Sequence, residues 1–305
     1  TMRTTMSGND YQHADTFNGA LHARFDFDLA TLESTTTFRK EELTFLVDYH
    51  ELYPPPISDT YGLSKKWNKR EEVTQELRLR SPDGDGSGVE WLVGLYGSYA
   101  DSKTPEFSNV IDYSSILPGF IYCANNPTKE RTTDFAPFGQ IVLPLTDSLR
   151  FTAGLRWQYT ARDFKMTIND NLFYPGNSPS ISHDDSWSEL MPKFVLSYQI
   201  TDEHMVYASA SKSFIPGGYN WASLDSRKLK YDKQTAWTYE AGAKTSWLDK
   251  RLLVNLTLFY NDFEDMQVMH WEGPNIFDYV ALNVPRASSY GAELEISALL
   301  TQGLT

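Results

Sequence analysis

Alternation of apolar and polar side chains organises this chain of 305 residues, and it is clearest within Phe138–Thr160. There a short polar turn, Thr146–Ser148, joins two runs whose period of two indicates β-strands, because successive strand side chains point to opposite faces. The opposite face of the second run is polar and includes Arg156, whereas one face carries no charge: Leu149, Phe151, Ala153, Leu155, Trp157 and Tyr159. Because a tilted strand crosses a bilayer in about 9–11 residues, this run predicts a membrane-spanning strand.

Short turns alternate with long irregular segments along the rest of the chain. The short turns lie at Asp28–Ala30, Ser81–Gly88, Thr146–Ser148, Thr201–Glu203, Leu248–Lys250 and Thr301–Gly303. The long segments lie at Asp48–Arg70, Asp101–Thr132, Asp163–Trp187, Pro216–Lys233 and Glu264–Arg286. This layout is typical of an all-β, antiparallel up-and-down transmembrane β-barrel, with tight turns on the periplasmic side and long loops outside. The pattern predicts about eleven or twelve strands of a larger barrel.

Charged side chains stand regularly opposite the apolar faces of these strands. They are predicted to face a wet lumen: Glu76, Arg78, Arg156, Glu240, Lys244, Glu293 and Glu295. Aromatic residues cluster where an apolar band would meet lipid headgroups: Trp157, Tyr159, Trp237, Tyr239, Trp247 and Tyr260. A soluble sandwich also contains Trp and Tyr, but it does not place charges so regularly opposite them, so the pattern favours the barrel.

Composition narrows the class of protein further. The net charge of −13 argues against nucleic acid as a partner. Apolar runs stay well below the roughly 18 residues that a transmembrane helix requires. Cys123 is the single cysteine, which leaves no intrachain disulfide and favours an isolated loop thiol.

Three short segments resemble chemical motifs, but each lacks an essential part. His183–Asp185 offers metal-type ligands, yet adjacent residues rarely converge on one ion. Asp83–Gly86 begins like a calcium loop without its downstream acidic ligand, and Pro216–Gly218 lacks the Lys-Ser/Thr and the helix of a phosphate loop. No nucleophile and base are arranged together, so we expect a protein that is not an enzyme and has no metal site or cofactor.

Six segments resemble, in order, sequence motifs of TonB-dependent outer-membrane receptors. They are Gln75–Ser81 (QELRLRS), Val93–Tyr96 (VGLY), Phe138–Arg156 (FGQ, LTD and AGLR), Pro192–Asn220 (PK, YAS and SKSFIPGGYN), Tyr239–Lys244 (YEAGAK) and Ser289–Leu294 (SYGAEL). Any one of them is a weak signal, whereas six in the order of the family are a strong one. The chain therefore resembles part of the β-barrel domain of this family.

The resemblance implies a place in the bacterial outer membrane, in contact with its lipid, and a transport function. The cargo would be a scarce, bulky small molecule or metal chelate, with a ferric siderophore as the leading candidate. The energy would come from the TonB complex through an N-terminal region. The plug domain, TonB box and closing C-terminal strands of the family are not found within residues 1–305, so we expect an internal piece of one barrel domain.

Aromatic residues in the long segments are the predicted cargo contacts. They are Tyr61, Trp67, Tyr113, Phe120, Tyr122, Tyr219, Trp221 and Trp271. Exposed aromatics are common in binding sites, and packing of one loop on another is the alternative role. Two other functions stay open at this point: a passive porin-like channel, and a soluble secreted β protein that binds carbohydrate.

Overall fold

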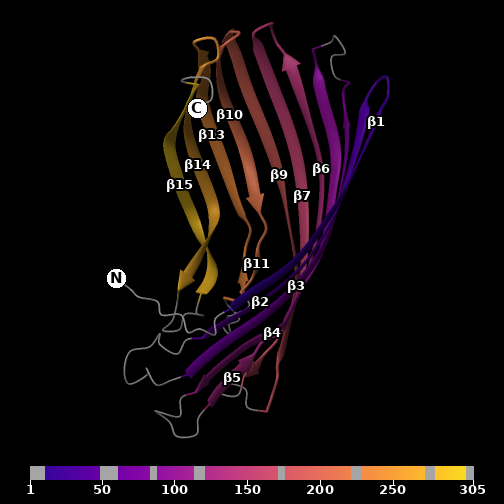
Figure 1. Cartoon of the computed structure of the whole chain (residues 1–305), viewed down its shortest axis with the longest axis vertical. Coiled ribbons are helices and arrows are strands. Elements are labelled where there is room, and N and C mark those ends of the chain that lie inside the picture. Colours follow the sequence, from indigo (N-terminus) through magenta and orange to yellow (C-terminus); the bar gives the residue numbers. More distant parts are fainter. Residues whose placement is uncertain are drawn as a thin grey trace.

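One large antiparallel sheet makes up most of the structure, a computed structural model (Figure 1). It describes residues 11–48, 61–82, 88–112, 121–170, 176–220, 228–271 and 279–299. Within these residues, eleven long strands follow one another across the sheet in chain order. They are β1 (Tyr11–Asp26), β2 (Thr31–Asp48), β3 (Tyr61–Arg80), β4 (Glu90–Asp112), β6 (Thr128–Pro144), β7 (Leu149–Thr167), β9 (Ser180–Thr201), β10 (His204–Ile215), β13 (Gln234–Trp247), β14 (Leu252–Trp271) and β15 (Tyr279–Ala298).

Four short strands lie beside this path. β5 (Ile121–Asn125) pairs with β4 and with β8 (Asn169–Asp170), and β11 (Gly218–Tyr219) pairs with β12 (Lys230–Tyr231) in a separate small sheet. Among the described residues, β1 and β15 each pair on one side only, so the sheet is open at both edges. The described part of the chain contains no helix that could span a membrane. The predicted all-β, antiparallel up-and-down fold is confirmed.

The short turns lie together at one end of the strands, at the top of Figure 1. At the turn between β6 and β7, the Thr146 hydroxyl accepts the backbone N–H groups of Ser148 and Leu149 at 3.3 and 3.0 Å. Such a side-chain bond closes a turn without a glycine. The predicted turn at Thr301–Gly303 lies outside the described residues.

The strands extend well into the segments that the sequence predicts as irregular loops. β4 has 23 residues, which at about 3.3 Å per residue is roughly 75 Å, far more than a membrane crossing requires. β3 begins already at Tyr61, and β14 continues to Trp271. The loop boundaries from the sequence are therefore wrong, because beyond the membrane neither face has to be apolar and the alternation that reveals a strand disappears.

The register separates two faces of the sheet. We call the face that carries Leu155, Trp157, Ala241 and Leu256 the outer face, and the face that carries Arg156 the lumen face. Large apolar side chains of the outer face are exposed, among them Leu155 at 49% and Leu258 at 53%. Exposed apolar surface of this extent is expected where lipid is the solvent.

Aromatic side chains bound this apolar band. We call the following outer-face residues the aromatic row: Tyr99, Phe135, Trp157, Tyr159, Trp237, Tyr239, Tyr260 and Tyr290. Their rings contact one another, with Trp157 and Tyr159 stacked at 6.2 Å and Trp237 and Tyr239 at 5.9 Å. Trp247, near the short-turn edge, lies ten positions beyond Trp237 on β13. At a tilt of about 40° this separation corresponds to roughly 25 Å along the membrane normal, the height of an outer-membrane apolar band.

A small hydrophobic core lies at the other end of the sheet, on the lumen face. It is formed by Phe164, Met166, Ile168, Tyr219 and Leu229, with Ile181 packed against it. This cluster joins β7 to residues 216–220 and 228–233, which carry β11 and β12. These described residues together are called segment 216–233 below. It is the place where residues distant in sequence bury apolar side chains together.

Candidate functional site

The lumen face is a continuous polar wall, and the register places all seven predicted lumen residues on it. Arg78 lies opposite Glu33 and Gly94, and Arg156 lies opposite Phe138. Glu76 follows from its pairing with Tyr96 on β4. The remaining members follow from pairing across β10, β13, β14 and β15: Glu240, Lys244, Glu293 and Glu295. The seven residues come from β3, β7, β13 and β15, and they lie on one face of the sheet.

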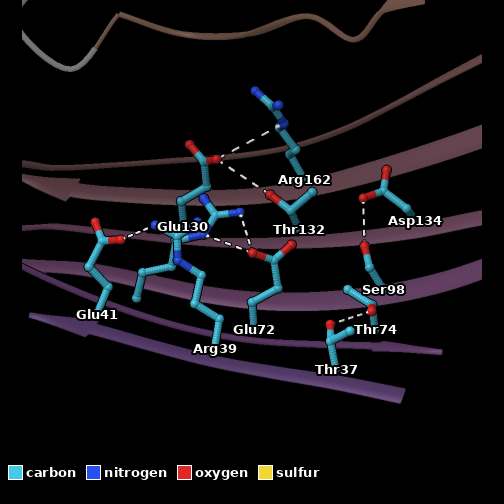
Figure 2. A network of polar contacts seen from close by, with 11 residues as sticks. Thr37, Arg39, Glu41, Glu72, Thr74, Ser98, Glu130, Thr132, Asp134 and Arg162 are labelled. Atoms are coloured by element: carbon cyan, nitrogen blue, oxygen red, sulfur yellow. Dashed lines mark hydrogen bonds and ion pairs between the residues drawn. The ribbon is translucent and has the colours of Figure 1, made fainter. Parts of the chain in front are cut away.

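Hydrogen bonds between strands connect this wall laterally (Figure 2). Ser98 donates to Asp134 at 2.7 Å, and the buried Thr160 hydroxyl donates to the other oxygen of the same carboxylate. The hydroxyls of Thr37 and Thr74 lie 2.6 Å apart. Such cross-strand bonds stiffen the wall and fix the rotamers of the polar groups that line it.

Ion pairs on the wall run mainly along single strands. Arg70 donates to Glu72 at 3.1 Å, Arg39 pairs with Glu41, and Arg78 pairs with Glu76. Because these groups are partly exposed, each pair contributes only about 0–1 kcal/mol to stability. Their main effect is a surface of balanced charge on which polar molecules and water can move.

Two predicted lumen cations lie over aromatic rings. The Arg156 guanidinium is 5.3 Å from the ring centre of Tyr96 and 5.7 Å from that of Phe138, and Lys244 is 5.8 Å from the ring of Tyr207. A β-carbon at Gly94 would overlap the Phe138 ring, so this glycine makes room for the ring to lie flat on the strand. The cations are thereby held in place rather than free to sweep the lumen.

Hydrogen bonds also connect the polar wall across the last three strands, β13, β14 and β15. Thr238 donates to Asn261 at 2.7 Å, and Asn261 donates to Ser289 at 3.1 Å. Asn255 donates to the predicted lumen residue Glu295 at 3.1 Å. These contacts join β13, β14 and β15 on the lumen side.

Segment 216–233 packs on the lumen face, farther from the short turns than the polar wall. β9 pairs with β10 only as far as Ser211, although β9 itself continues to Ser180, so the two strands separate there. The segment lies in the opening and is held by Trp187, whose indole N–H donates to Asp232 at 2.9 Å. A β-carbon at Gly217 would come within 2.7 Å of the Trp187 ring, so only glycine permits this approach.

Tyr219 anchors the segment electrostatically as well as by packing. Its ring stacks on Phe164 at 4.8 Å, and its hydroxyl donates to Asp185 at 2.8 Å. Burial and the adjacent Asp185 carboxylate raise the pKa of Tyr219, so the hydroxyl keeps its proton. Burial alone would raise the pKa of Asp185, but hydrogen bonds from Lys230 and Tyr219 lower it below its ordinary value.

Asn220 connects the segment to the far side of the sheet. Its side-chain amide donates to the carbonyl of Ala281 at 2.9 Å and accepts the Ala281 N–H at 2.8 Å, as a neighbouring strand would. The same amide donates to the Lys228 carbonyl at 2.7 Å. Gln267 adds a bond to the Pro216 carbonyl at 3.0 Å, so segment 216–233 is held to β14 and β15 as well as to β7.

The predicted loop aromatics lie in different environments. Tyr219 is only 6% exposed, so its ring packs inward and presents no binding surface. Trp67 lies opposite Thr44 on the outer face of β3, with Lys69 Nζ 4.3 Å from its ring centre. Three are described by backbone position alone, in β3, β5 and β14: Tyr61, Tyr122 and Trp271. The others lie outside the described residues: Tyr113, Phe120 and Trp221.

The metal-type tripeptide is divided between the two faces. His183 stacks on Tyr219 with ring centres 5.9 Å apart, and Asp185 binds Tyr219 and Lys230. Asp184 pairs with Asp163 on the outer face. Asp184 therefore points away from His183 and Asp185, because adjacent strand residues lie on opposite faces.

The sequence interpretation missed the apolar residues of the lumen face. Phe164 and Met166 are 3% and 0% exposed, and both occupy even positions of β7, where the lower part of the strand carries polar residues. The signal was available, because the apolar positions of β7 change from odd to even after Tyr159. This inversion marks the place where β7 leaves the apolar band and receives segment 216–233.

A comparison with known protein families shows to which family this chain belongs. The family described as "TonB dependent receptor-like, beta-barrel" matches residues 2–305. The chain belongs to this family. Its members are transport receptors of the bacterial outer membrane, which excludes the soluble carbohydrate-binding alternative.

Solved structures share the fold. The ferric yersiniabactin uptake receptor FyuA from Yersinia pestis superposes with a TM-score of 0.78 at 18% identity, over 98% of this chain and 42% of that one. The ferric-catecholate import receptor Fiu from E. coli, in its closed form, gives 0.71 at 20% identity, over 97% and 46%. The chain thus spans less than half of each receptor.

One curated relative is similar in sequence over a shorter stretch. The metal-pseudopaline receptor CntO of Pseudomonas aeruginosa is 27% identical over 170 residues, which are 54% of this chain and 22% of that protein. The lumen face fits a receptor wall, because it offers polar side chains from several strands and carries segment 216–233 against it.

Proposed function

We propose that this chain forms part of the barrel wall of a receptor that takes up a scarce metal chelate, first of all a ferric siderophore, with energy from TonB. The observation that supports it most is the continuous polar wall of the lumen face in a chain of this receptor family. Proteins similar to it are a ferric yersiniabactin uptake receptor and a metal-pseudopaline receptor. The wall would guide a hydrophilic chelate while lipid covers the outer face.

Gating is the physical reason to propose energised uptake over a passive channel. A barrel wide enough for a bulky chelate has an aqueous lumen and leaks unless a plug closes it. We propose that a plug elsewhere in the intact receptor contacts the lumen wall, and that TonB releases it. The paired charges of the wall, such as Arg78 with Glu76, would then brace the plug without binding it irreversibly.

We further propose that cargo first binds at the end of the sheet opposite the short turns. Trp221 and Trp271 remain the proposed contacts there, together with Tyr61, Tyr113, Phe120 and Tyr122. Tyr219 has a different role in this proposal, because its ring is enclosed. It would hold segment 216–233 so that the neighbouring residues face the mouth of the barrel.

The test is uptake of radiolabelled ferric siderophore by cells that carry the intact receptor, with and without TonB. We expect uptake to require both, and deletion of the receptor to slow growth under iron limitation. Equal uptake without TonB would assign the protein to passive channels. Normal growth and uptake after deletion would remove iron chelates as cargo.

Sidedness is tested separately on intact cells with single cysteines placed in a Cys123→Ser background, because Cys123 is exposed and would itself react. A cysteine at Trp221 or Trp271 should react with a membrane-impermeant maleimide, whereas one at Asp147, in a short turn, should be protected. Labelling at Asp147 with protection at both tryptophan positions would reverse the proposed topology.

A further inference from the structure

Three hydrogen-bonding side chains interrupt the apolar band of the outer face. We call them the polar patch: Ser34 and Thr36 on β2, and Gln75 on β3. Leu32 pairs with Leu79, and pairing across β4 and β6 places both leucines on the same face as Leu155. The patch residues follow these two leucines at steps of two residues, so they share the outer face.

Exposed apolar side chains surround the polar patch on β1 to β4, which lie side by side in the sheet (Figure 1). They are Leu21, Phe25, Phe38, Val73, Leu77 and Leu95. In the described part of the chain, Gln75 is the one amide side chain on the outer face between the aromatic row and the short turns. Acyl chains form no hydrogen bonds, so polar groups within an apolar band need protein partners.

The polar patch bonds within itself but keeps one donor and one acceptor. The Thr36 hydroxyl donates to Gln75 Oε1 at 2.5 Å. Gln75 Nε2 donates to Ser34 Oγ at 3.0 Å and to the Glu76 carbonyl at 3.3 Å. An amide oxygen has two lone pairs and a serine hydroxyl carries a proton, so Gln75 Oε1 can accept one more bond and Ser34 can donate one. Among the described residues, neither of these two bonds is formed.

Gly97 on β4 lies opposite Gln75 and leaves the polar patch open to approach. A β-carbon there would meet no described atom closer than the Asp134 carbonyl oxygen at 3.8 Å, so packing within the sheet does not require a glycine. Glycines of the lumen face differ, because a β-carbon at Gly94 or Gly242 would overlap an aromatic ring. A glycine inside a strand costs stability, and it often marks a place where another backbone approaches closely.

We propose that the polar patch is the centre of a two-fold interface between two copies of this receptor in the membrane. Ser34 of each copy donates to Gln75 Oε1 of the other, and the open side at Gly97 lets the two sheets approach. One spare donor and one spare acceptor are self-complementary under a two-fold axis, which forms the bond twice. The proposal rests on the proposed contact of the outer face with lipid, and it is independent of the cargo and of TonB.

The size of this surface indicates a reversible pair. Four strands about 4.8 Å apart, crossing an apolar band roughly 25 Å high, offer about 400 Å² on each copy. The total of roughly 800 Å² is smaller than the interface of a stable soluble complex. The apolar ring excludes competing polar groups from the bonds at the centre, and small residues let the surfaces meet closely. Pairing should therefore depend on the hydrogen bonds of the polar patch.

Cross-linking tests the interface directly, in the intact receptor with a Cys123→Ser background in lipid vesicles. Leu77→Cys places a thiol beside the polar patch without changing the patch itself. Leu258→Cys on the outer face of β14 is the matched control, since both leucines are exposed. We expect a short bis-maleimide to link two copies through Leu77→Cys and not through Leu258→Cys. Equal yields at both positions would indicate random collision and overturn the proposal.

Energy transfer between donor-labelled and acceptor-labelled receptors measures the pairing as lipid is added. With dyes at Asp147→Cys, in a short turn, Gln75→Leu should pair about tenfold more weakly, because two hydrogen bonds between the copies are lost. Gly97→Leu should abolish pairing by blocking the approach, whereas Ala292→Leu adds bulk to the outer face of β15 and should change nothing. Unchanged pairing in Gln75→Leu would confine the amide to its own sheet and overturn the proposal.

Two further results separate this interface from other roles of the polar patch. If Gln75→Leu does not insert, Gly97→Leu decides, since a β-carbon there has room, and pairing as in the unchanged receptor would contradict the proposal. In native outer membranes, Leu77→Cys should link to a second copy. Linkage to a different protein, without pairing of the purified receptor, would assign the patch to that protein instead. Cargo uptake enters none of these measurements, so their failure is distinct from a failure of the proposed transport.

Discussion

The two parts of strand β7 carry their large apolar side chains on opposite faces. We call residues 149–159, which begin at the short turn, the lower part and residues 160–167 the upper part, so the lower part is at the top of Figure 1. In the lower part, Leu155 and Trp157 lie on the outer face with 49% and 38% exposure, and Arg156 faces the lumen. In the upper part, Phe164 and Met166 lie on the lumen face and are almost fully buried. The same strand thus changes which side is apolar, because its surroundings change from lipid to water and folded chain. The environment of each segment, and not the strand itself, decides the pattern.

The largest expected loss of stability comes from a substitution in the upper part of β7. Met166→Ala removes a side chain with no exposed surface from the core beneath segment 216–233, and should cost about 2–5 kcal/mol of local stability. Hydrogen exchange within residues 216–233 should accelerate while the band of β7 stays protected. Met191→Ala is the control, since Met191 is a half-buried methionine on the lumen face opposite Arg156. Equal acceleration in both variants would mean that no separate upper core exists.

A charge placed in the apolar band of the outer face tests whether that face meets lipid. Leu256→Arg on the outer face of β14 should cost about 2–4 kcal/mol of folding free energy in lipid vesicles if it lies near the midplane. The neighbouring Asn255→Arg, on the lumen face opposite Glu295, should cost little. Similar costs at both positions would show that the two faces of β14 meet the same solvent.

The same comparison of the two parts of β7 shows how much of the fold could be predicted from the sequence. In the band, a single alternation revealed the faces of Leu155 and Arg156, and the turn at Thr146–Ser148 fixed the strand order nearby. Beyond the band both faces are wet, so the alternation fades and β4 was predicted to end near Asp101 instead of Asp112. Local sequence contains no other signal for a strand whose two faces are both polar.

The site was less predictable, because its contacts join residues far apart in sequence. Tyr219 was predicted as an exposed loop aromatic, yet it packs on Phe164, some fifty-five positions earlier in the chain. The pairing of Asn220 with Ala281 spans sixty-one positions. Such contacts depend on the separation of β9 from β10, which no single segment of sequence encodes.

A smaller effect is expected from the hydroxyl of Tyr219. Tyr219→Phe removes the donor to the Asp185 carboxylate and should cost about 1.5–3 kcal/mol of local stability in segment 216–233. Limited proteolysis of the segment measures it. The cost should shrink in an Asp185→Asn background, because the charged acceptor is then absent. An undiminished cost there would assign the effect to ring packing alone.

The smallest effect is a pH dependence confined to the upper part. The pKa of Asp185 is lowered in the folded state, so its bonds to Lys230 and Tyr219 stabilise the segment above the ordinary carboxyl pKa of about 4 and lose this contribution as the pH falls through the lowered value. The local opening equilibrium of residues 216–233, obtained from hydrogen-exchange rates corrected for the intrinsic pH dependence of amide exchange, should therefore be constant between about pH 7 and 5 and rise below about pH 4. The Asp185→Asn variant should lack this rise, and a rise of equal size in it would exclude Asp185 as the origin.

A spin-label scan along β7 tests the central claim most directly. Single cysteines from Phe151 to Met166 are placed in the intact receptor in a Cys123→Ser background, in lipid vesicles. Their spin labels report collisions with oxygen, which prefers lipid, and with a water-soluble nickel chelate. We predict oxygen contact at 151, 153, 155 and 157, nickel contact at 152, 154 and 156, and then a reversal in which 163 and 165 meet water while 164 and 166 meet neither reagent. Nickel contact at 155 with oxygen contact at 156, or an unbroken pattern through 166, would contradict the account.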